Sequence, residues 1–148
     1  MTPDAPAPLE PGNLFGPMVP MARALGLVAE AIGPDWARIR LPYDAQFTNT
    51  RGDLHGGALL TLLDCAVACA ARSLDPMGMA VMTVDLSTHF LSGASTDVVA
   101  SSRCLRRGKS LAFSQCEVHD ADGNLVATAT ATLKLIVRGE RPPKRPPA

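Results

Sequence analysis

Residues 55–72 read HGGALLTLLDCAVACAAR, and this stretch decides the fold. From position 58 to position 71 the only polar or charged side chains are Thr61 and Asp64, and most of the others are Ala and Leu, which are good helix formers. The sequence therefore predicts a helix over 58–72 that is apolar all round. Because a helix without a polar stripe must be covered on nearly every side, we expect it to be the central element of the fold.

Strand patterns lie on both sides of this helix. Before it, residues 27–32 and 36–41 flank a Gly-Pro-Asp turn and predict a hairpin. The final strand alternates strictly between small apolar residues and threonines, as expected of a strand with one buried face. The order predicts an α+β domain with a hotdog fold, in which a curved antiparallel sheet wraps around one long helix. The strands expected after the helix, separated by short turns, cover 80–91, 98–105, 111–119 and 125–137.

Length and charge set limits on the function. The chain has 148 residues, 47% of them hydrophobic, which fits one globular domain. Its 14 Lys and Arg residues balance 14 Asp and Glu residues, which argues against binding nucleic acid or an anionic membrane by bulk charge. Without a long apolar run or a secretory signal, a soluble cytoplasmic protein is expected. The four cysteines lack a metal-ligand spacing, so we expect reduced, mostly buried thiols and no metal site.

Proline marks the limits of the domain, because it cannot donate a backbone hydrogen bond inside a sheet or helix. Six of the 13 prolines fall in residues 1–20 and four in residues 142–148. We therefore expect a proline-rich arm over 1–20, extended or only loosely packed, and a folded domain over 21–137. The tail over 138–148 holds four basic side chains against Glu140 and is expected to be solvated.

The loop before the helix carries the chemistry. Gly56 and Gly57 open the helix, where the first amides have no intrahelical partner and the helix dipole is positive. Without a side chain, these residues let a ligand oxygen approach closely, so the turn predicts an oxyanion site. Asp64 lies on an otherwise apolar helix, and a carboxylate there is costly to bury unless it is paired or functional. A structural ion pair with Arg72 or Arg103 is the alternative.

The spacing of these two groups indicates a shared site. At 1.5 Å of helical rise per residue, Gly56 and Asp64 are separated by roughly 12 Å, which is too far for both to act on one carbonyl group. If both act on it, the Gly56 amide belongs to one subunit and Asp64 to another. The sequence therefore predicts an obligate homodimer with two sites across its interface.

Several of these residues match a known family. Asn49, the sequence His55-Gly56-Gly57, Asp64 and the later segment Met82-Thr83-Val84-Asp85 resemble the PaaI-like hotdog acyl-CoA thioesterases, which include the phenylacetic acid degradation and Them2-type enzymes. The resemblance covers about residues 25–137. It implies a homodimer, or a homotetramer as a dimer of dimers, that hydrolyses the thioester of acyl-CoA. It also implies that no cofactor or metal is needed, because coenzyme A is part of the substrate.

The resemblance also implies a role for each matched residue. Asp64 corresponds to the catalytic carboxylate, as general base or nucleophile, and Gly56 to the oxyanion donor. Asn49 would orient the thioester carbonyl or the attacking water, and His55 would support the loop. Thr83 corresponds to a hydroxyl that holds this water near the carboxylate.

The phosphates of coenzyme A require cations. The only dense basic cluster in the predicted domain lies at one hairpin, and a solvated hairpin tip explains it equally well. Gly57, beside the oxyanion donor, is a further candidate for substrate contact. The candidates for the phosphate contacts are Arg103, Arg106, Arg107 and Lys109.

Two other functions remain open at this point. A hotdog hydratase or dehydratase resembles this chain less, because such relatives often carry His-Phe-Pro where this chain has His-Gly-Gly. A non-catalytic acyl-CoA-binding hotdog module would keep the fold and the pocket. For the favoured thioesterase, small alanines on the helix and on the last strand, with Phe47, Phe90 and Phe113 available, suit a medium-chain or aromatic acyl group.

Overall fold

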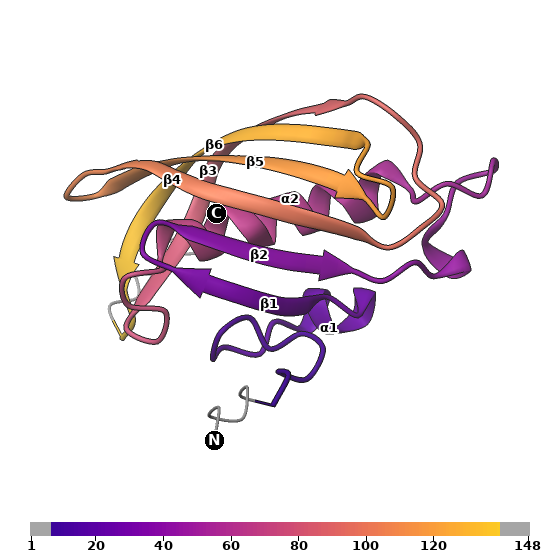
Figure 1. The fold of residues 1–148 in the computed structure, drawn as a ribbon. Helices are drawn as coiled ribbons and strands as arrows, with labels where there is room; N and C mark the ends of the chain where they lie inside the picture. Colours follow the sequence, from indigo (N-terminus) through magenta and orange to yellow (C-terminus); the bar gives the residue numbers. More distant parts are fainter. Residues whose placement is uncertain (1–6, 140–148) are drawn as a thin grey trace, which may run out of the picture.

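The computed structural model describes residues 7–139. All six strands form one antiparallel sheet in the order β1-β2-β4-β5-β6-β3, and the sheet curves around the long helix α2 (Figure 1). This arrangement confirms the predicted α+β hotdog fold. The elements are α1 (Pro20–Leu25), β1 (Val28–Gly33), β2 (Trp36–Leu41), the 3-10 turn η1 (Ala45–Phe47), α2 (Gly56–Ala71), β3 (Met79–Phe90), β4 (Val98–Arg107), β5 (Leu111–Asp120) and β6 (Leu125–Val137).

The inner face of the sheet is made of small side chains. On β6, Ala127, Ala129 and Ala131 are buried while Thr130 is exposed, as the alternation predicts. These alanines leave room for α2 to lie close to the sheet. The Ser102 hydroxyl of β4 fixes the helix further, since it donates to the Ala66 carbonyl at 2.7 Å.

One side of α2 stays open within the described chain, contrary to the prediction that the helix is covered on nearly every side. The exposed or half-buried positions recur every three or four residues, so they form one continuous stripe along the helix. Leu60, in the middle of this stripe, is 40% exposed. We call it the open stripe, and its members are Gly57, Leu60, Thr61, Asp64, Cys65 and Ala68.

Within the described part of the chain, strand β3 lies at the edge of the sheet and pairs only with β6. Its apolar side chains Met82, Val84 and Phe90 are 48%, 60% and 52% exposed. An edge of unpaired backbone groups beside exposed apolar side chains is a ready surface for pairing with another strand. This edge and the open stripe adjoin, because Asp64 on α2 is hydrogen-bonded to Thr83 on β3.

The N-terminal arm differs from the prediction where the structure describes it, over residues 7–19. Leu14 is only 2% exposed, and the Gly12 amide donates to the Leu27 carbonyl at 2.8 Å. The arm is held by buried Arg72, whose guanidinium donates to the Leu14 carbonyl. The arm is thus packed against the domain, because the Leu14 side chain is buried and the Arg72 guanidinium binds the Leu14 carbonyl.

The ends of the chain limit two expectations. Residues 1–6 of the predicted arm, and the predicted basic tail from residue 140 onward, lie outside the described residues. Within residues 7–139, no helix has the length and hydrophobicity to cross a membrane.

Candidate active site

The N-terminus of α2 is built around His55. This residue precedes the helix in an extended conformation, and its Nδ1 atom accepts a hydrogen bond of 2.8 Å from the Gly57 amide. A nitrogen that accepts cannot carry the proton, so neutral His55 is protonated at Nε2. His55 also donates its own amide to the Phe47 carbonyl at 2.8 Å. His55 therefore fixes the loop to the helix and occupies the Gly57 amide, which is then not available to a ligand.

The Gly56 amide, unlike the Gly57 amide, is not occupied by a side chain. It donates no hydrogen bond to an acceptor among the described residues, so it remains free to bind an oxyanion. Gly56 lines a cavity of about 320 Å³ together with Asn49, Leu59 and Phe90. The ring of Phe90 lies so close that a Cβ atom on Gly56 would meet it at 3.6 Å. The sequence offers Phe90 only as one of three phenylalanines available to an acyl group, because its contact with Gly56 joins distant parts of the chain.

Asp64 and Thr83 form the second half of the candidate site. The Thr83 hydroxyl donates to Asp64 Oδ1 at 2.6 Å, and both side chains are half-buried. Neither Arg72 nor Arg103 forms an ion pair with Asp64 in the part of the chain that the structure describes. The ion pair expected as the alternative for Asp64 is therefore wrong for the described residues. Its second oxygen, Oδ2, is left for a water molecule or a substrate.

The thiols nearest to Asp64 are chemically quiet. Burial raises the pKa of Cys65 to about 12, with smaller contributions from the neighbouring Cys69 and Asp64. Burial also raises the pKa of Cys69 to about 11, although Arg72 lowers it in part. Because the thiolate is the nucleophilic form, these cysteines remain protonated near neutral pH. All four cysteines are free, as expected of core thiols.

Asn49 closes the loop that leads to the helix. Its Oδ1 atom accepts from the amides of Arg51 and Asp53, at 2.8 and 3.3 Å, and its backbone amide donates to the Asp53 carbonyl. Among the described residues, no acceptor is bound to its Nδ2 group. Asn49 lines the same cavity as Gly56, so its side-chain NH₂ is the part that can reach a ligand.

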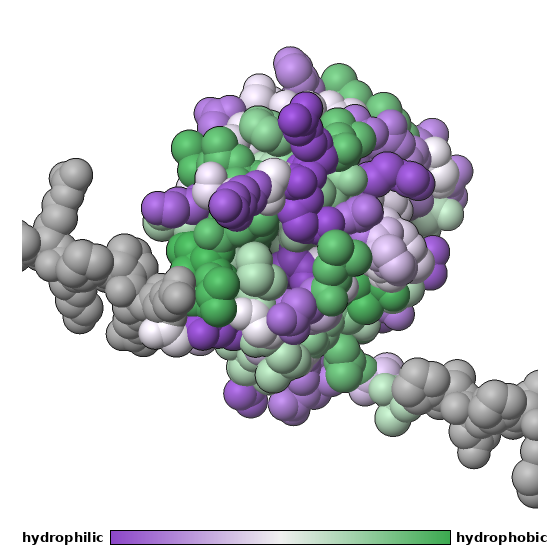
Figure 2. All heavy atoms as spheres, turned by 90° about the vertical axis from the view of Figure 1, so that its left-hand side faces the viewer, coloured by the Kyte–Doolittle hydropathy of each residue, from purple (hydrophilic) through white to green (hydrophobic). Residues whose placement is uncertain are grey.

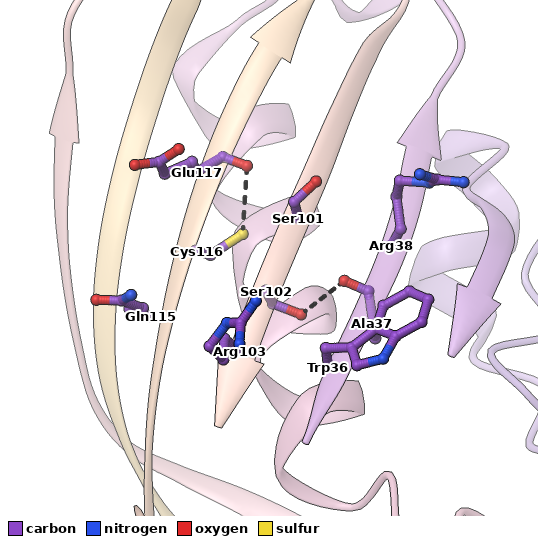
Figure 3. A pocket seen from close by; sticks show the side chains of 9 residues that line it. All are labelled: Trp36, Ala37, Arg38, Ser101, Ser102, Arg103, Gln115, Cys116 and Glu117. Carbon is purple, nitrogen blue, oxygen red and sulfur yellow. Dashed lines mark hydrogen bonds between the residues drawn. The ribbon is translucent and has the colours of Figure 1, made fainter. Parts of the chain in front are cut away.

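The four basic candidates are in three different environments. Arg107 caps the end of α2, since its guanidinium donates to the carbonyls of Ala70 and Ala71 and pairs with Asp35. Arg103 lies on the outer face of the sheet, on the side away from α2, beside Trp36 (Figure 3). Arg106 and Lys109 are exposed near the hairpin tip. The structure therefore does not bring these four residues together.

Gly56 and Asp64 both belong to the single helix α2, as the spacing argument requires. At 1.5 Å per residue they are about 12 Å apart along its axis. The described chain thus holds a free amide near Phe90 and a carboxylate bound to Thr83, placed at two different points along β3.

Comparison with known proteins identifies the family. Residues 51–127 match the family model described as the thioesterase superfamily. Human acyl-coenzyme A thioesterase 13 is 30% identical over 121 residues, which cover 76% of this chain and 83% of that protein. A protein from Halobacterium salinarum is 34% identical over 64% of this chain, which spans only 66% of that relative's length. The solved structure of the Escherichia coli PaaI protein from the phenylacetic acid degradation operon has the same fold, with a TM-score of 0.73, 24% identity, and coverage of 78% of this chain and 83% of that one. The chain therefore belongs to the thioesterase superfamily and has a hotdog fold.

Proposed function

We propose that this protein hydrolyses acyl-CoA thioesters with medium-chain or aromatic acyl groups. The observation that carries the proposal is the half-buried carboxylate of Asp64 on α2, which accepts a hydrogen bond from the Thr83 hydroxyl on β3. The first amide of the same helix α2, that of Gly56, is free among the described residues. A carboxylate and a free amide are the groups that thioester hydrolysis needs. No step of this chemistry requires a cofactor.

In the proposed reaction, Asp64 acts as a general base. It takes a proton from water while the water oxygen attacks the thioester carbon, and the carbonyl oxygen becomes an oxyanion that accepts from the Gly56 amide. The C–S bond then breaks, and the proton on Asp64 passes to the departing coenzyme A sulfur. Attack by Asp64 itself, followed by hydrolysis of the anhydride, would use the same groups. Asn49 Nδ2 would orient the carbonyl or the water, and Thr83 would hold the carboxylate.

We propose further that Gly56 and Asp64 act across a homodimer whose two β3 edges pair antiparallel. Thr83 and Phe90 both face α2 and mark the two halves of the site. We place Thr83 of one subunit opposite Phe90 of the other. The bulge between Thr83 and Asp85 adds one unpaired residue to β3, so the two-fold axis of this strand pair runs through Ser87, which lies opposite its own copy. In the same register, Asp85 lies opposite His89 of the partner subunit on the outer face, where a ring N–H of the imidazole can donate to the carboxylate. Exposed Arg106 and Lys109 remain our candidates for the phosphates of coenzyme A.

The hydrolysis is tested with a panel of acyl-CoA substrates, from acetyl to lauroyl and including phenylacetyl, followed by thiol release. Asp64→Asn should lower turnover by at least about a hundredfold, because the amide cannot accept the proton. Asp122→Asn, in the exposed turn between β5 and β6, is the matched control and should retain turnover. Near-normal turnover in Asp64→Asn would reject the assigned carboxylate. Absence of wild-type turnover with acyl-CoA still bound would favour a non-catalytic binding module.

The register is tested by cross-linking. Ser87→Cys should give a covalent dimer on mild oxidation, because two cysteines at the axis of an antiparallel pair come within disulfide distance. Thr130→Cys is the control, since Thr130 pairs with Ser87 within the chain and faces the same way one strand further from the edge. A dimer in solution that Ser87→Cys does not cross-link would exclude this register.

A further inference from the structure

Two cavities flank the first turn of α2. The first is the cavity of Gly56, Asn49 and Phe90 described above. The second has a volume of about 310 Å³ and lies between α1, η1 and the first two turns of α2. We call it the α1 cavity. The residues of its lining that matter here are Met21, Leu25, Phe47, His55, Ala58 and Thr61.

Most of the polar groups that line the α1 cavity are already bonded to neighbours, and His55 Nε2 and Gln46 Oε1 are the side-chain atoms for which the described residues provide no partner. The Thr61 hydroxyl donates to the Gly57 carbonyl at 3.0 Å, and the Gly57 amide donates to His55 Nδ1. The Thr48 hydroxyl donates to the Ala45 carbonyl at 2.7 Å, and Gln46 Nε2 donates to Asp44 Oδ2 at 2.9 Å. A ligand in this cavity therefore meets methyl, methylene and aromatic groups, and few free polar groups. Such a lining suits an apolar chain or ring.

The cavity of Gly56 is more polar, although Leu59 and Phe90 also line it. Its lining includes Asn49, with its unengaged NH₂ group, and Arg51, which is 73% exposed and paired with Asp53 at 3.6 Å. The hydrated, polar half of an acyl-CoA fits this side better than its hydrocarbon half does. The residues His55-Gly56-Gly57 separate the two cavities, with Gly56 on the polar side and Gly57 on the apolar side.

We propose that the α1 cavity is the acyl subsite, a proposal that rests on the proposed function. Its volume lies at the lower end of the roughly 300–1,000 Å³ of ligand pockets, so the substrate class is a compact acyl group of medium chain length or with a single ring. Met21 forms its rim and is 58% exposed. An unbranched thioether side chain adapts to ligands of different shape, so Met21 is a residue that determines acyl length.

The test uses alkyl thioethers of coenzyme A, which cannot be hydrolysed, so the result does not depend on turnover. The ratio of the affinities for octyl-CoA and methyl-CoA is measured by calorimetry. Met21→Trp should lower this ratio at least about tenfold, since the indole fills space that the chain needs. Thr61→Phe should act in the same direction from the opposite wall. Met18→Trp, two residues before α1 and outside the lining, should leave the ratio unchanged.

The outcomes separate the two proposals. An unchanged ratio in both Met21→Trp and Thr61→Phe, with the fold intact by circular dichroism, would place the acyl group elsewhere and overturn this inference alone. A lowered ratio without hydrolysis by the wild type would support the subsite and contradict the thioesterase. If the wild type did not discriminate octyl-CoA from methyl-CoA, the subsite would be rejected whatever the turnover.

Discussion

The two ends of α2 differ in how their backbone groups are satisfied. At the C-terminal end, Arg107 donates to the carbonyls of Ala70 and Ala71, and the Arg72 amide donates to the Ala68 carbonyl. At the N-terminal end, His55 accepts from the Gly57 amide, but the Gly56 amide has no acceptor among the described residues. One end is closed by a guanidinium, whereas the other leaves a donor free.

This difference follows from the dipole of the helix. Cations stabilise the carbonyl end, so arginines there serve the fold. The amide end attracts anions, and a chain that leaves an amide free there can bind the oxygen of a substrate. Figure 2 shows the left-hand side of the molecule in Figure 1, the side to which the C-terminal end of α2 points, where hydrophilic and hydrophobic side chains intermingle. The cavities beside α2 lie instead at its N-terminal end.

Removing the free amide gives the largest expected effect. Gly56→Pro deletes this donor at the first helical position, where Pro is well tolerated, and His55 already has the extended conformation that a following Pro favours. We expect turnover to fall by about 10²–10³, as for the loss of one oxyanion donor, while the fold is retained. Thiol release from acyl-CoA measures the turnover, and circular dichroism checks the fold.

Gly56→Ala is the matched control for the amide. It keeps the N–H, and its Cβ atom would lie 3.6 Å from the Phe90 ring, an ordinary contact. It should therefore remain far more active than Gly56→Pro. Equal losses of turnover in Gly56→Pro and Gly56→Ala would mean that the substrate needs the space left by the missing side chain at Gly56, and not its amide. In mixed dimers, Gly56→Pro and Asp64→Asn subunits should restore one working site, and no rescue after proven subunit exchange would contradict the shared site.

The sequence predicted the six strands and the long helix α2 well. The strands begin and end within about two residues of the predicted positions, because alternation with one buried face fixes a strand locally. The helix starts at Gly56 rather than at residue 58, since glycines are poor helix formers and only the His55 cap marks the start. Helix α1 was missed, although Pro20 and the left-handed Gly26 bracket it, because six residues are too few to show a period.

The candidate site was predictable in part. Asp64 and Thr83 could be paired only through the family resemblance, and the structure joins them at 2.6 Å. The Gly57 amide is bound and the Gly56 amide is free because of the orientation of the His55 ring, whose Nδ1 accepts from Gly57. The sequence does not indicate this orientation. The sequence could not predict that Arg107 caps α2. Its carbonyl partners are 36 and 37 residues away in the chain and Asp35 is 72 residues away, so only the tertiary fold brings them together.

The closed end of α2 gives the smaller effect, and on stability rather than on chemistry. Arg107→Met keeps the apolar stem but removes the hydrogen bonds to two helix carbonyls and the ion pair with Asp35. We expect the free energy of unfolding in urea to fall by about 2 kcal/mol, because these carbonyls lose charged donors in a mostly buried place. Arg106→Met, one residue away but exposed, should change it by less than about 0.5 kcal/mol. If Arg107→Met instead weakened coenzyme A binding and left stability intact, Arg107 would be a ligand contact, and the contrast between the two ends of α2 would fail.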